Sequence, residues 1–489
     1  MSALIKFKYS WKKSKNVIKY INIGWVINLK ENEIEKQIKY IANIHELLNG
    51  KNKKFSIYTM GCTLNENDSE KISGMATQMG YTKTENILDA DLIIFNTCCI
   101  RENAEEKLFG KLGEVKKLKE DNNVIIAVCG CMMQQQHIID KIKKSYKYVD
   151  IIFGTHTLHK FPEDLYNLLN QKNKVIDVLD IDGEVYEGLP IKRESNNKAL
   201  VTIMYGCNNF CTYCIVPYVR GRERNRKPED ILNEIETLAK EGYKEVTLLG
   251  QNVNSYKGNG YQGINNFADL LRAINKIEGI EIINFISPHP KDFTDDVILA
   301  IKESKKVSRI LHLPLQSGSS NVLKRMNRKY TKEQYINLAN KIKKEVPDVV
   351  FSTDIIVGFP GETESDFEDT LDVVKQIGFE QVFMFIYSKR VGTPAEKMED
   401  QIPEEIKHKR FNKLKQLVEE QMQENNKKYI GTVQNILIES KSKTNDNMLT
   451  GRTKTNKVVI IEANEKLIGK IVNVKIISEH MWYLKGEIV

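Results

Sequence analysis

The chain has 489 residues, of which 41% are hydrophobic and 28% charged, which allows roughly two to four domains with cores of their own. No apolar run reaches the roughly 18 residues that a membrane-spanning helix needs, which predicts a soluble protein without membrane contact. The formal net charge is +8, with both ends basic and the middle nearly balanced. Basic ends suit a polyanionic partner, although a solvated lysine-rich surface explains the charge more simply.

Residues 1–52 form a basic extension, in which a short helix is expected near 31–48. The first 28 residues contain six Lys and no acidic residue. They lack the uninterrupted apolar stretch and the cleavage site of a secretory signal, and they contain no Arg, which organellar transit peptides usually carry. We therefore expect a cytoplasmic protein. The extension itself indicates no function.

Residues 53–172 alternate short apolar runs with longer amphipathic stretches, which predicts an α/β domain with a mostly parallel, Rossmann-like sheet. Strands are expected at 55–59, 92–95, 124–128 and 149–153. Helices are expected at 65–79, 104–119, from about 132, and at 161–169. A polar segment at 174–198 is predicted to be an irregular linker.

A second alternating series occupies residues 193–427 and predicts a partial (β/α)6 barrel or an open, curved parallel sheet. Its strands are expected at 200–204, 245–249, 281–286, 310–313, 349–356 and 381–385. Helices are expected between them at 230–241, 267–277, 295–304, 332–345 and 364–377, and a long polar helix at 404–426 follows.

The pattern changes again in residues 428–489, where β-branched runs are separated by Gly and Asn. Strands are expected at 430–439, 448–450, 457–461 and 471–477. This predicts a small all-β unit, plausibly a five-stranded barrel.

Three cysteines at Cys-x3-Cys-x2-Cys spacing follow the first strand of the central series. They are Cys207, Cys211 and Cys214. Three thiolates can hold three corners of a 4Fe–4S cluster and leave the fourth iron open for chemistry. A zinc knuckle would need a fourth ligand, and the nearest His in the sequence, His159 and His289, are far away. The loop lies at the expected mouth of the barrel, where α/β proteins place their active sites, so we expect a catalytic cluster here.

The other five cysteines belong to the N-terminal domain. Cys62, Cys98 and Cys131 each lie just past the end of a predicted strand, where loops of a parallel sheet converge. A single buried cysteine would be read as inert, but three at equivalent strand ends predict a second cluster. Close clustering also favours metal over disulfides. Cys99 and Cys129 adjoin these positions and are ambiguous.

The Cys207 loop resembles the radical-SAM signature, including the aromatic Tyr213 before the third Cys. Residues 53–489 as a whole are similar to the methylthiotransferase family. The resemblance implies an α/β chain with a methylthiotransferase domain that holds an auxiliary 4Fe–4S cluster (53–172), a radical-SAM core (193–427) and an RNA-binding TRAM barrel (428–489). The basic extension lies outside the shared pattern.

Within that family the chain most resembles the MiaB-type branch, through its strings at 96–107, 218–224, 248–256, 312–319 and 450–454. The family carries its ligands in Asn-Thr-Cys and Gly-Cys contexts, which favours Cys98 and Cys131 and leaves Cys99 and Cys129 as small packing residues. It often has Ser where this chain has Cys99, a departure that leaves the role of this residue in doubt.

The resemblance implies radical methylthiolation at C2 of N6-isopentenyladenosine in tRNA, next to the anticodon at position 37, to give 2-methylthio-N6-isopentenyladenosine. Two S-adenosylmethionine molecules are consumed, one as the methyl donor and one as the source of a hydrogen-abstracting radical. An electron donor such as flavodoxin or ferredoxin is implied. The sulfur donor is unknown, and a monomer is expected.

Contacts to the cofactor are expected at the ends of the barrel strands, although tight turns explain the same residues. These are Gly250, Gln251, Asn252, Gln316, Asp354 and Gly358. Basic residues are expected to contact RNA, although a solvated face is the alternative and a guanidinium also suits the cofactor carboxylate. These are Arg220, Arg222, Arg224, Arg452 and Lys454.

Three other functions compete with this interpretation. The same chemistry acts on threonylcarbamoyladenosine in tRNA or on an aspartate of a ribosomal protein in sister branches, and the strings at 100–102 and 249–252 argue against both. A non-catalytic RNA-binding iron–sulfur protein would bind tRNA without cleaving S-adenosylmethionine. The three-cysteine loop argues against that alternative.

Overall fold

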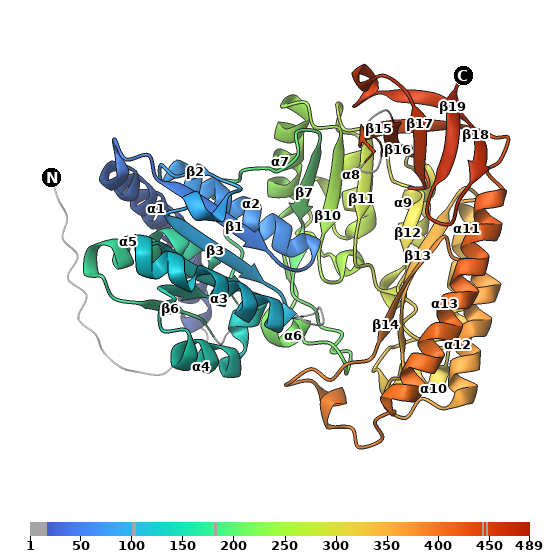
Figure 1. Ribbon diagram of the computed structural model, residues 1–489, viewed down its shortest axis with the longest axis horizontal. Coiled ribbons are helices and arrows are strands. Elements are labelled where there is room, and N and C mark those ends of the chain that lie inside the picture. The colour runs from blue at the N-terminus through green and yellow to red at the C-terminus, as the bar shows by residue number, and fades with distance from the viewer. Residues whose placement is uncertain (1–16, 100–103, 180–182, 443–444, 446–447) are drawn as a thin grey trace.

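The computed structural model describes residues 17–99, 104–179, 183–442, 445 and 448–489, with side chains from residue 33 onward. Figure 1 shows three parts: an α/β domain on the left, a curved sheet lined by helices in the centre, and a small β-barrel at the upper right. The first 16 residues of the basic extension, and the whole string at 100–102 that weighed against the sister branches, lie outside the described residues. No described helix is both long and apolar enough to cross a membrane.

The N-terminal domain is built on a six-stranded sheet whose neighbouring strands all run parallel, in the order β2-β1-β3-β4-β5-β6. Strand β3 is buried along its whole length, as its Leu-Ile-Ile-Phe run requires in a sheet covered on both faces. The strands are β1 Lys54–Thr59, β2 Thr82–Lys83, β3 Leu92–Thr97, β4 Ile125–Gly130, β5 Ile151–Phe153 and β6 Val175–Asp177. The helices are α2 Thr63–Gln78, α3 Ala104–Asn122, α4 Gln136–Ser145 and α5 Phe161–Gln171.

Two details of this domain differ from the prediction. Strand β6 lies inside the segment expected to be an irregular linker, because Val175 to Asp177 extend the sheet by pairing with β5. The helix expected from about residue 132 begins as a 3-10 turn, Cys131–Gln134, and α4 starts only at Gln136.

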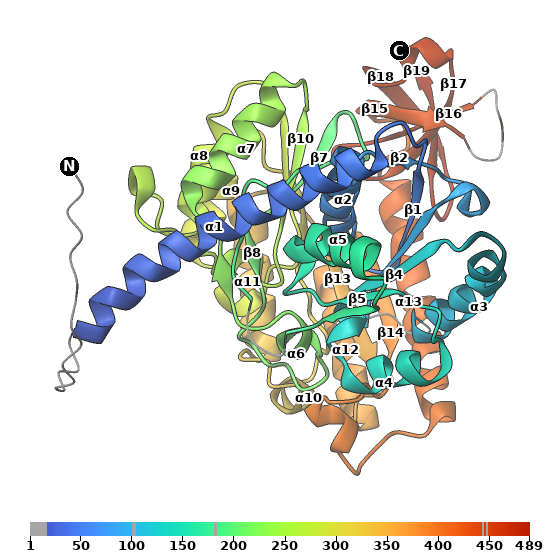
Figure 2. The same cartoon turned by 90° about the vertical axis from the view of Figure 1, so that its left-hand side faces the viewer.

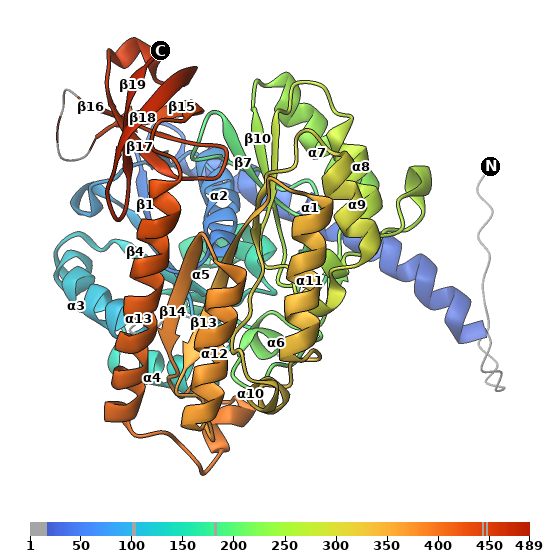
Figure 3. The ribbon, with the colours of Figure 1, turned by 90° about the vertical axis from the view of Figure 1, so that its right-hand side faces the viewer.

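The extension contains one long helix, α1 Val17–Leu48, rather than the short one expected. Its C-terminal half packs on α5, where Lys36 forms a 2.8 Å ion pair with Glu163 and Ile44 is fully buried. Its N-terminal half extends away from the body of the protein (Figures 2 and 3).

The central part is the expected open partial barrel of six parallel strands. Two three-stranded sheets, β7-β10-β11 and β12-β13-β14, are joined by a parallel bridge between Ile283 and Val307. Among the described residues β7 and β14 do not pair, so the sheet is open there. The strands are β7 Lys198–Thr202, β10 Glu245–Leu249, β11 Ile282–Phe285, β12 Ile310–His312, β13 Val350–Val357 and β14 Gln381–Ile386.

Helices cover the outer face of this barrel. They are α7 Pro228–Lys240, α8 Phe267–Asn275, α9 Asp295–Glu303, α11 Lys332–Glu345, α12 Glu364–Ile377 and α13 Glu404–Lys427. Helices α11 and α12 both begin with a capping box, at Thr331 and Thr363, and each cap is worth about 1 kcal/mol. Phe367 and Leu371 lie one turn apart on α12 and pack on the sheet, as the helical period predicts.

The pairing of β13 with β14 identifies the inner face of the barrel. Asp354 pairs with Phe383 and Ile356 with Phe385, and these residues point away from the helices. Phe383 and Phe385 are 41% and 50% exposed. The inner face therefore carries exposed aromatic rings.

The C-terminal part is the expected five-stranded barrel, closed in the order β15-β16-β17-β19-β18. A Cβ on Gly451 would lie 2.5 Å from Ile436, so the closure of the barrel requires glycine there. Two ion pairs join it to the partial barrel: Lys198 to Glu439 at 3.0 Å and Lys457 to Glu380 at 2.7 Å. The strands are β15 Val433–Lys441, β16 Met448–Arg452, β17 Val458–Glu462, β18 Ile471–Glu479 and β19 Leu484–Ile488.

A buried ion-pair network joins the N-terminal domain to the partial barrel. Arg193 contacts Glu70 of α2 at 3.0 Å and also Glu234 of α7, and Arg226 contacts Glu234 at 2.7 Å and Glu187 at 2.6 Å. Removing one partner of a buried pair leaves an uncompensated charge, which typically costs about 3–5 kcal/mol. The network therefore fixes how the strand ends of the two domains face each other.

Candidate functional site

The first cysteine loop follows β7 and the short strand β8 Met204–Tyr205. The Cys207 N–H donates to the carbonyl of Gly221 at 3.1 Å, and the Cys214 N–H donates to that of Cys211 at 2.9 Å. Gly206 has a φ of 76°, and a Cβ there would collide with the Arg222 carbonyl, so this turn requires glycine. The three cysteines thus lie on one tight loop at the carboxyl ends of the strands, as predicted.

The three thiols of this loop lie in a shared, mostly buried environment. Burial, together with the neighbouring Cys211, raises the pKa of Cys207 to about 11 and that of Cys214 to about 12. Such thiols ionise only when a cationic group binds them. Three converging soft ligands with this property fit an iron–sulfur cluster.

Side chains from the segment between α10 Ser320–Arg325 and α11 support this loop. Arg328 is buried, and its Nη1 donates to the Cys211 Sγ at 3.5 Å and its Nη2 to the Pro314 carbonyl at 3.1 Å. Asn327 donates to the carbonyls of Asn209 and Phe210 at 3.1 and 2.9 Å. The sequence analysis missed both residues, because they follow the loop by more than 100 positions and belong to no motif.

The predicted cofactor residues after β10 lie beside the loop. Gln251 accepts a hydrogen bond from the Gly206 N–H, and a Cβ on Gly250 would lie 2.6 Å from Met204. The Asn252 side chain is buried and donates to Asp292 at 2.8 Å, while its Oδ1 has no hydrogen-bond partner. A buried acceptor without a partner next to the three thiols suits a bound polar group.

Of the remaining predicted cofactor residues, Gln316 follows β12, and Asp354 lies within β13 and Gly358 directly after it. Gln316 bonds to Asp354 through its backbone N–H at 2.8 Å and has a φ of 69°. The Asp354 carboxylate lies 3.4 Å from His312 on the inner face. Gly358 has a φ of 72°, and the side chain of Lys407 lies where its Cβ would be, so packing within the chain also requires glycine there; its contact with the cofactor stays a prediction.

The second group of cysteines gathers at the carboxyl edge of the N-terminal sheet. Cys62 caps α2, Cys98 follows β3, and Cys131 follows β4. The amide of Asn65 is placed between two of them, with its Oδ1 3.4 Å from the Cys62 Sγ and 3.9 Å from the Cys131 Sγ. Cys98 lies against Gly61, where an added Cβ would be 3.1 Å from its Sγ. The strand ends thus bring the three thiols together.

Cys129 and Cys99, the ambiguous pair, differ in position. Cys129 lies in β4 and packs in the core against α1, α2 and α5, as a packing residue should. Cys99 packs on Ile215 and Val219 but also reaches the thiol of Cys131. Its hydrogen bond, together with the Arg220 guanidinium, lowers the pKa of Cys131 to about 6.

Because Cys98 and Cys99 both lie at this edge, their roles can be separated by iron content. Cys98→Ala is expected to lower the iron bound per chain by about half, since Cys98 is one of the three residues predicted to hold the second cluster. Cys99→Ala is expected to leave iron unchanged. Iron and sulfide are measured after anaerobic reconstitution, and the reverse result would assign the ligand to Cys99.

The two cysteine groups face each other across the short helix α6 Val216–Val219, which lies between the two domains in Figure 1. Ile215, the residue after Cys214, packs with Val219 against Cys131. Arg390 donates to the Cys99 carbonyl at 3.3 Å and lowers the pKa of Cys214, which burial raises, so it lies close to both groups.

Three of the basic residues predicted to bind RNA follow the first cysteine loop, and they differ in their exposure to solvent. Arg220 is a correction: it is 4% exposed and directed at Cys131 and Asp68, where it has no access to an RNA backbone. Arg224 is half-buried and donates to the Arg220 carbonyl at 3.1 Å. Arg222 is exposed, with its guanidinium 4.4 Å above the ring of Phe210.

The two predicted RNA residues of the C-terminal barrel lie where it meets the partial barrel. Arg452 contacts Glu439 at 3.1 Å, and Glu439 in turn contacts Lys198. Lys454 is exposed in the turn before Lys457, which pairs with Glu380 at the start of β14. Both basic residues therefore lie beside the open edge of the partial barrel.

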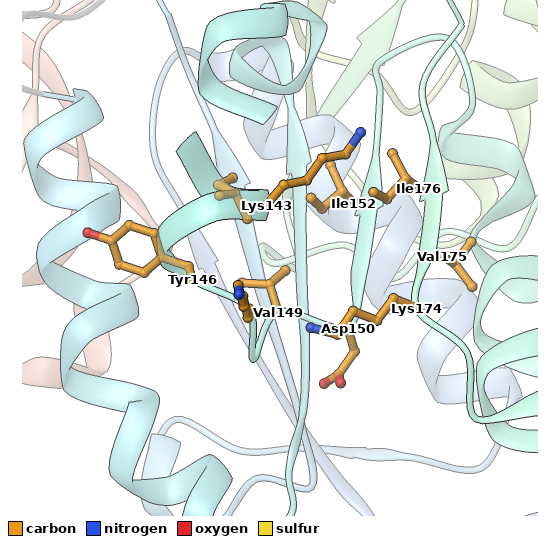
Figure 4. Close-up of a pocket in the computed structure, with 10 residues that line it drawn as sticks. Lys143, Tyr146, Val149, Asp150, Ile152, Lys174, Val175 and Ile176 are labelled. Carbon is orange, nitrogen blue, oxygen red and sulfur yellow. The ribbon is translucent and has the colours of Figure 1, made fainter. Parts of the chain in front are cut away.

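Two cavities elsewhere in the described part of the chain are lined by no cysteine. Figure 4 shows one of about 280 Å³ between α4, β5 and β6, lined by Tyr146, Asp150 and Val175 among others. A larger one of about 820 Å³ lies between residues 183–187 and 224–227. No three His, Cys, Asp or Glu side chains in the described part are arranged to hold a single metal ion.

Three family matches cover most of the chain. Residues 201–374 match the radical SAM superfamily, residues 427–489 match the TRAM domain, and residues 54–154 match an uncharacterized protein family, UPF0004. They correspond to the partial barrel, the closed barrel and the N-terminal domain.

The chain is also similar to curated proteins along nearly its whole length. It is 53% identical to the tRNA-2-methylthio-N(6)-dimethylallyladenosine synthase of Acetivibrio thermocellus over 470 residues, which are 95% of this chain and 98% of the relative. It is 56% identical to the enzyme of the same name from Clostridium perfringens over 438 residues, 89% of this chain and 98% of the relative.

Among solved structures the fold is similar to the radical S-adenosylmethionine methyltransferase TsrM from Kitasatospora setae with cobalamin and a [4Fe-4S] cluster bound. The TM-score is 0.51 at 12% identity, over 70% of this chain and 77% of that one. At this identity the likeness concerns the fold alone.

Proposed function

The chain belongs to the family of tRNA-2-methylthio-N(6)-dimethylallyladenosine synthases, and on that premise we propose that Cys207, Cys211 and Cys214 hold its catalytic 4Fe–4S cluster. It is a radical-SAM transferase that methylthiolates tRNA. The observation that supports the assignment of these residues is the tight three-thiol loop at the strand ends, which faces a second cysteine group across α6. The chemistry that a bound cluster supplies there is reductive cleavage of S-adenosylmethionine to a hydrogen-abstracting radical.

The residues around this loop bind and orient the cofactor. Gln251 holds the turn through the Gly206 N–H, and the buried Oδ1 of Asn252 is an acceptor that suits the ammonium group of S-adenosylmethionine. Gln316 and Asp354 lie at neighbouring strand ends and offer further polar contacts. Arg328 positions the Cys211 thiol.

Cys62, Cys98 and Cys131 would hold the second 4Fe–4S cluster, and a cluster bound there would supply the sulfur chemistry of the methylthio transfer. The support is their convergence around Asn65, whose side chain is anchored by the Thr97 carbonyl at 2.9 Å. Arg390, Ile215 and the α6 residue Val219 exclude water between the two sites. A substrate carbon held at this boundary can be reached from both cysteine groups.

The tRNA substrate contacts the TRAM barrel and the inner face of the partial barrel. Arg222, Arg452 and Lys454 offer exposed or half-exposed charges for phosphate. Phe383 and Phe385 are exposed on the inner face of the partial barrel, and unpaired bases of a loop stack on such rings. The protein acts as a monomer in the cytoplasm, with an electron donor such as flavodoxin or ferredoxin.

Substrate choice is tested with anticodon stem–loop RNAs that differ only in the adenosine next to the anticodon. The reconstituted enzyme is expected to convert the isopentenyladenosine RNA and to leave the threonylcarbamoyladenosine and unmodified RNAs unchanged, as read by nucleoside mass spectrometry. Conversion of the threonylcarbamoyl RNA, or of a ribosomal protein aspartate, would assign the chain to a sister activity. Binding of all RNAs without cleavage of S-adenosylmethionine would support a non-catalytic protein.

Removing both TRAM charges, in the double variant R452A/K454A, is expected to weaken tRNA binding and to lower its salt dependence. Each lost phosphate contact reduces the slope of log K against log salt by about 0.7–0.9. Binding is measured at several salt concentrations by fluorescence anisotropy. Lys344→Ala, which removes an exposed charge from α11 on the outer face, is the control and should change neither value; equal effects would contradict the assigned surface.

A further inference from the structure

Arg220 belongs to the partial barrel, but its side chain contacts residues of the N-terminal domain. It is the C-cap residue of α6, six residues after Cys214, and its side chain extends into the N-terminal domain. Its Nε donates to the Cys131 Sγ at 3.0 Å, and its Nη2 lies 3.4 Å from the Asn65 Oδ1. With 4% of its surface exposed, the guanidinium is almost completely removed from water.

The charge of this guanidinium is balanced within the same site. Asp68 of α2 is 3% exposed, and its Oδ2 lies 2.7 Å from the Arg220 Nη2. A buried cation next to a single carboxylate and a cysteine sulfur is satisfied best when that sulfur carries negative charge. The three groups form one polar cluster: a cation, its carboxylate partner and a metal-binding thiol.

The position of Arg220 is fixed by the packing of α6 on the N-terminal domain. Ile215 and Val219 contact Cys131, and the Thr155 hydroxyl donates to the Val219 carbonyl at 2.7 Å. The Arg220 N–H donates to the Val216 carbonyl at 2.8 Å, which closes the single helical turn. The guanidinium therefore reaches Cys131 only when the two domains are docked as in the structure.

We propose that Arg220 is a positioning residue for the second cysteine site, which orients the Cys131 sulfur and sets the reduction potential of the cluster held there. The inference rests on the proposed function, since it assumes a cluster on Cys62, Cys98 and Cys131. A hydrogen bond and a positive charge at a ligand sulfur stabilise the more negative, reduced cluster and so raise its potential. Asp68 opposes this effect by neutralising part of the charge.

The test is a redox titration, followed by electron paramagnetic resonance, of full-length protein in which Cys207, Cys211 and Cys214 are all Ala, so that only the second cluster gives a signal. Arg220→Gln is expected to make the potential more negative, and Asp68→Asn is expected to make it more positive. Arg220→Lys keeps the charge and should give a smaller shift than Arg220→Gln. Lys344→Gln, which removes an exposed charge from α11 on the outer face, is the control and should give none.

Opposite shifts of the reduction potential in the Arg220 and Asp68 variants at equal iron content would support the proposal. A general loss of stability would not shift the two potentials in opposite directions. Unchanged potentials in variants that carry the cluster would overturn it. If Arg220→Gln binds no cluster, the Asp68→Asn variant decides: a more positive potential supports the proposal, and an unchanged or more negative potential overturns it. Absence of any second cluster in the parent protein would overturn the proposed function itself, and this outcome is read from iron content before any titration.

Discussion

Cys207→Ala is expected to abolish both cleavage of S-adenosylmethionine and formation of the methylthiolated nucleoside. With two thiolates left, the loop can no longer hold three corners of a 4Fe–4S cluster, and the electron needed for cleavage has no route to the cofactor. The loss should be complete rather than partial, because no acid or base at the site can replace radical chemistry at an unactivated C–H bond. The readout is 5′-deoxyadenosine formed under reducing conditions.

Cys129→Ala is the matched control for this variant. It also removes a buried thiol, but Cys129 packs in the core of the N-terminal sheet and away from Cys207. This variant should retain cleavage, with at most a modest loss of stability from the small cavity. Cleavage by Cys207→Ala at the rate of the parent protein would contradict the assignment of the catalytic loop.

Cys62→Ala is expected to separate the two halves of the reaction. The Cys207 loop is intact in this variant, so 5′-deoxyadenosine should still form. The methylthio product should not, because the second site has lost one of its three ligands and cannot hold its cluster. Iron content should fall by about half.

Both products of the Cys62→Ala reaction are measured together by liquid chromatography and mass spectrometry on the same sample. Simultaneous loss of 5′-deoxyadenosine would indicate that Cys62 serves the first site or the fold as a whole. Unchanged methylthio product would remove Cys62 from the second site. Either result would contradict the two-cluster arrangement.

The sequence was sufficient to predict features that depend on local pattern. Strand β3 is a short apolar run, and the loop of Cys207 follows a predicted strand, so both were placed within a few residues. The convergence of Cys62, Cys98 and Cys131 was also predictable, because the carboxyl ends of parallel strands meet at one edge.

Features that depend on contacts between distant segments were not predictable. Arg220 is close to Cys214 in the sequence, which suggested a surface beside the first site, but the single turn of α6 directs it into the other domain. Gly358 belongs to a turn that suggested ligand approach, and the space is occupied by Lys407 from α13. Arg328 reaches Cys211 across 117 positions of sequence and has no motif to mark it.

The face-to-face arrangement of the two cysteine groups depends on interactions between domains. Arg193 contacts Glu70 of the N-terminal domain and Glu234 of α7, and no periodicity in the sequence connects these segments. Strand β6 was not predicted for a related reason, because its three residues form a strand only by pairing with β5.

The nucleoside composition of tRNA tests the central claim most directly. We would compare tRNA from cells that contain the protein, cells that lack it, and lacking cells supplied with either the parent chain or Cys207→Ala. The account predicts that 2-methylthio-N6-isopentenyladenosine disappears without the protein, that its isopentenyladenosine precursor accumulates, and that the parent chain but not the variant restores it. An unchanged level of the methylthiolated nucleoside in cells that lack the protein would contradict the account.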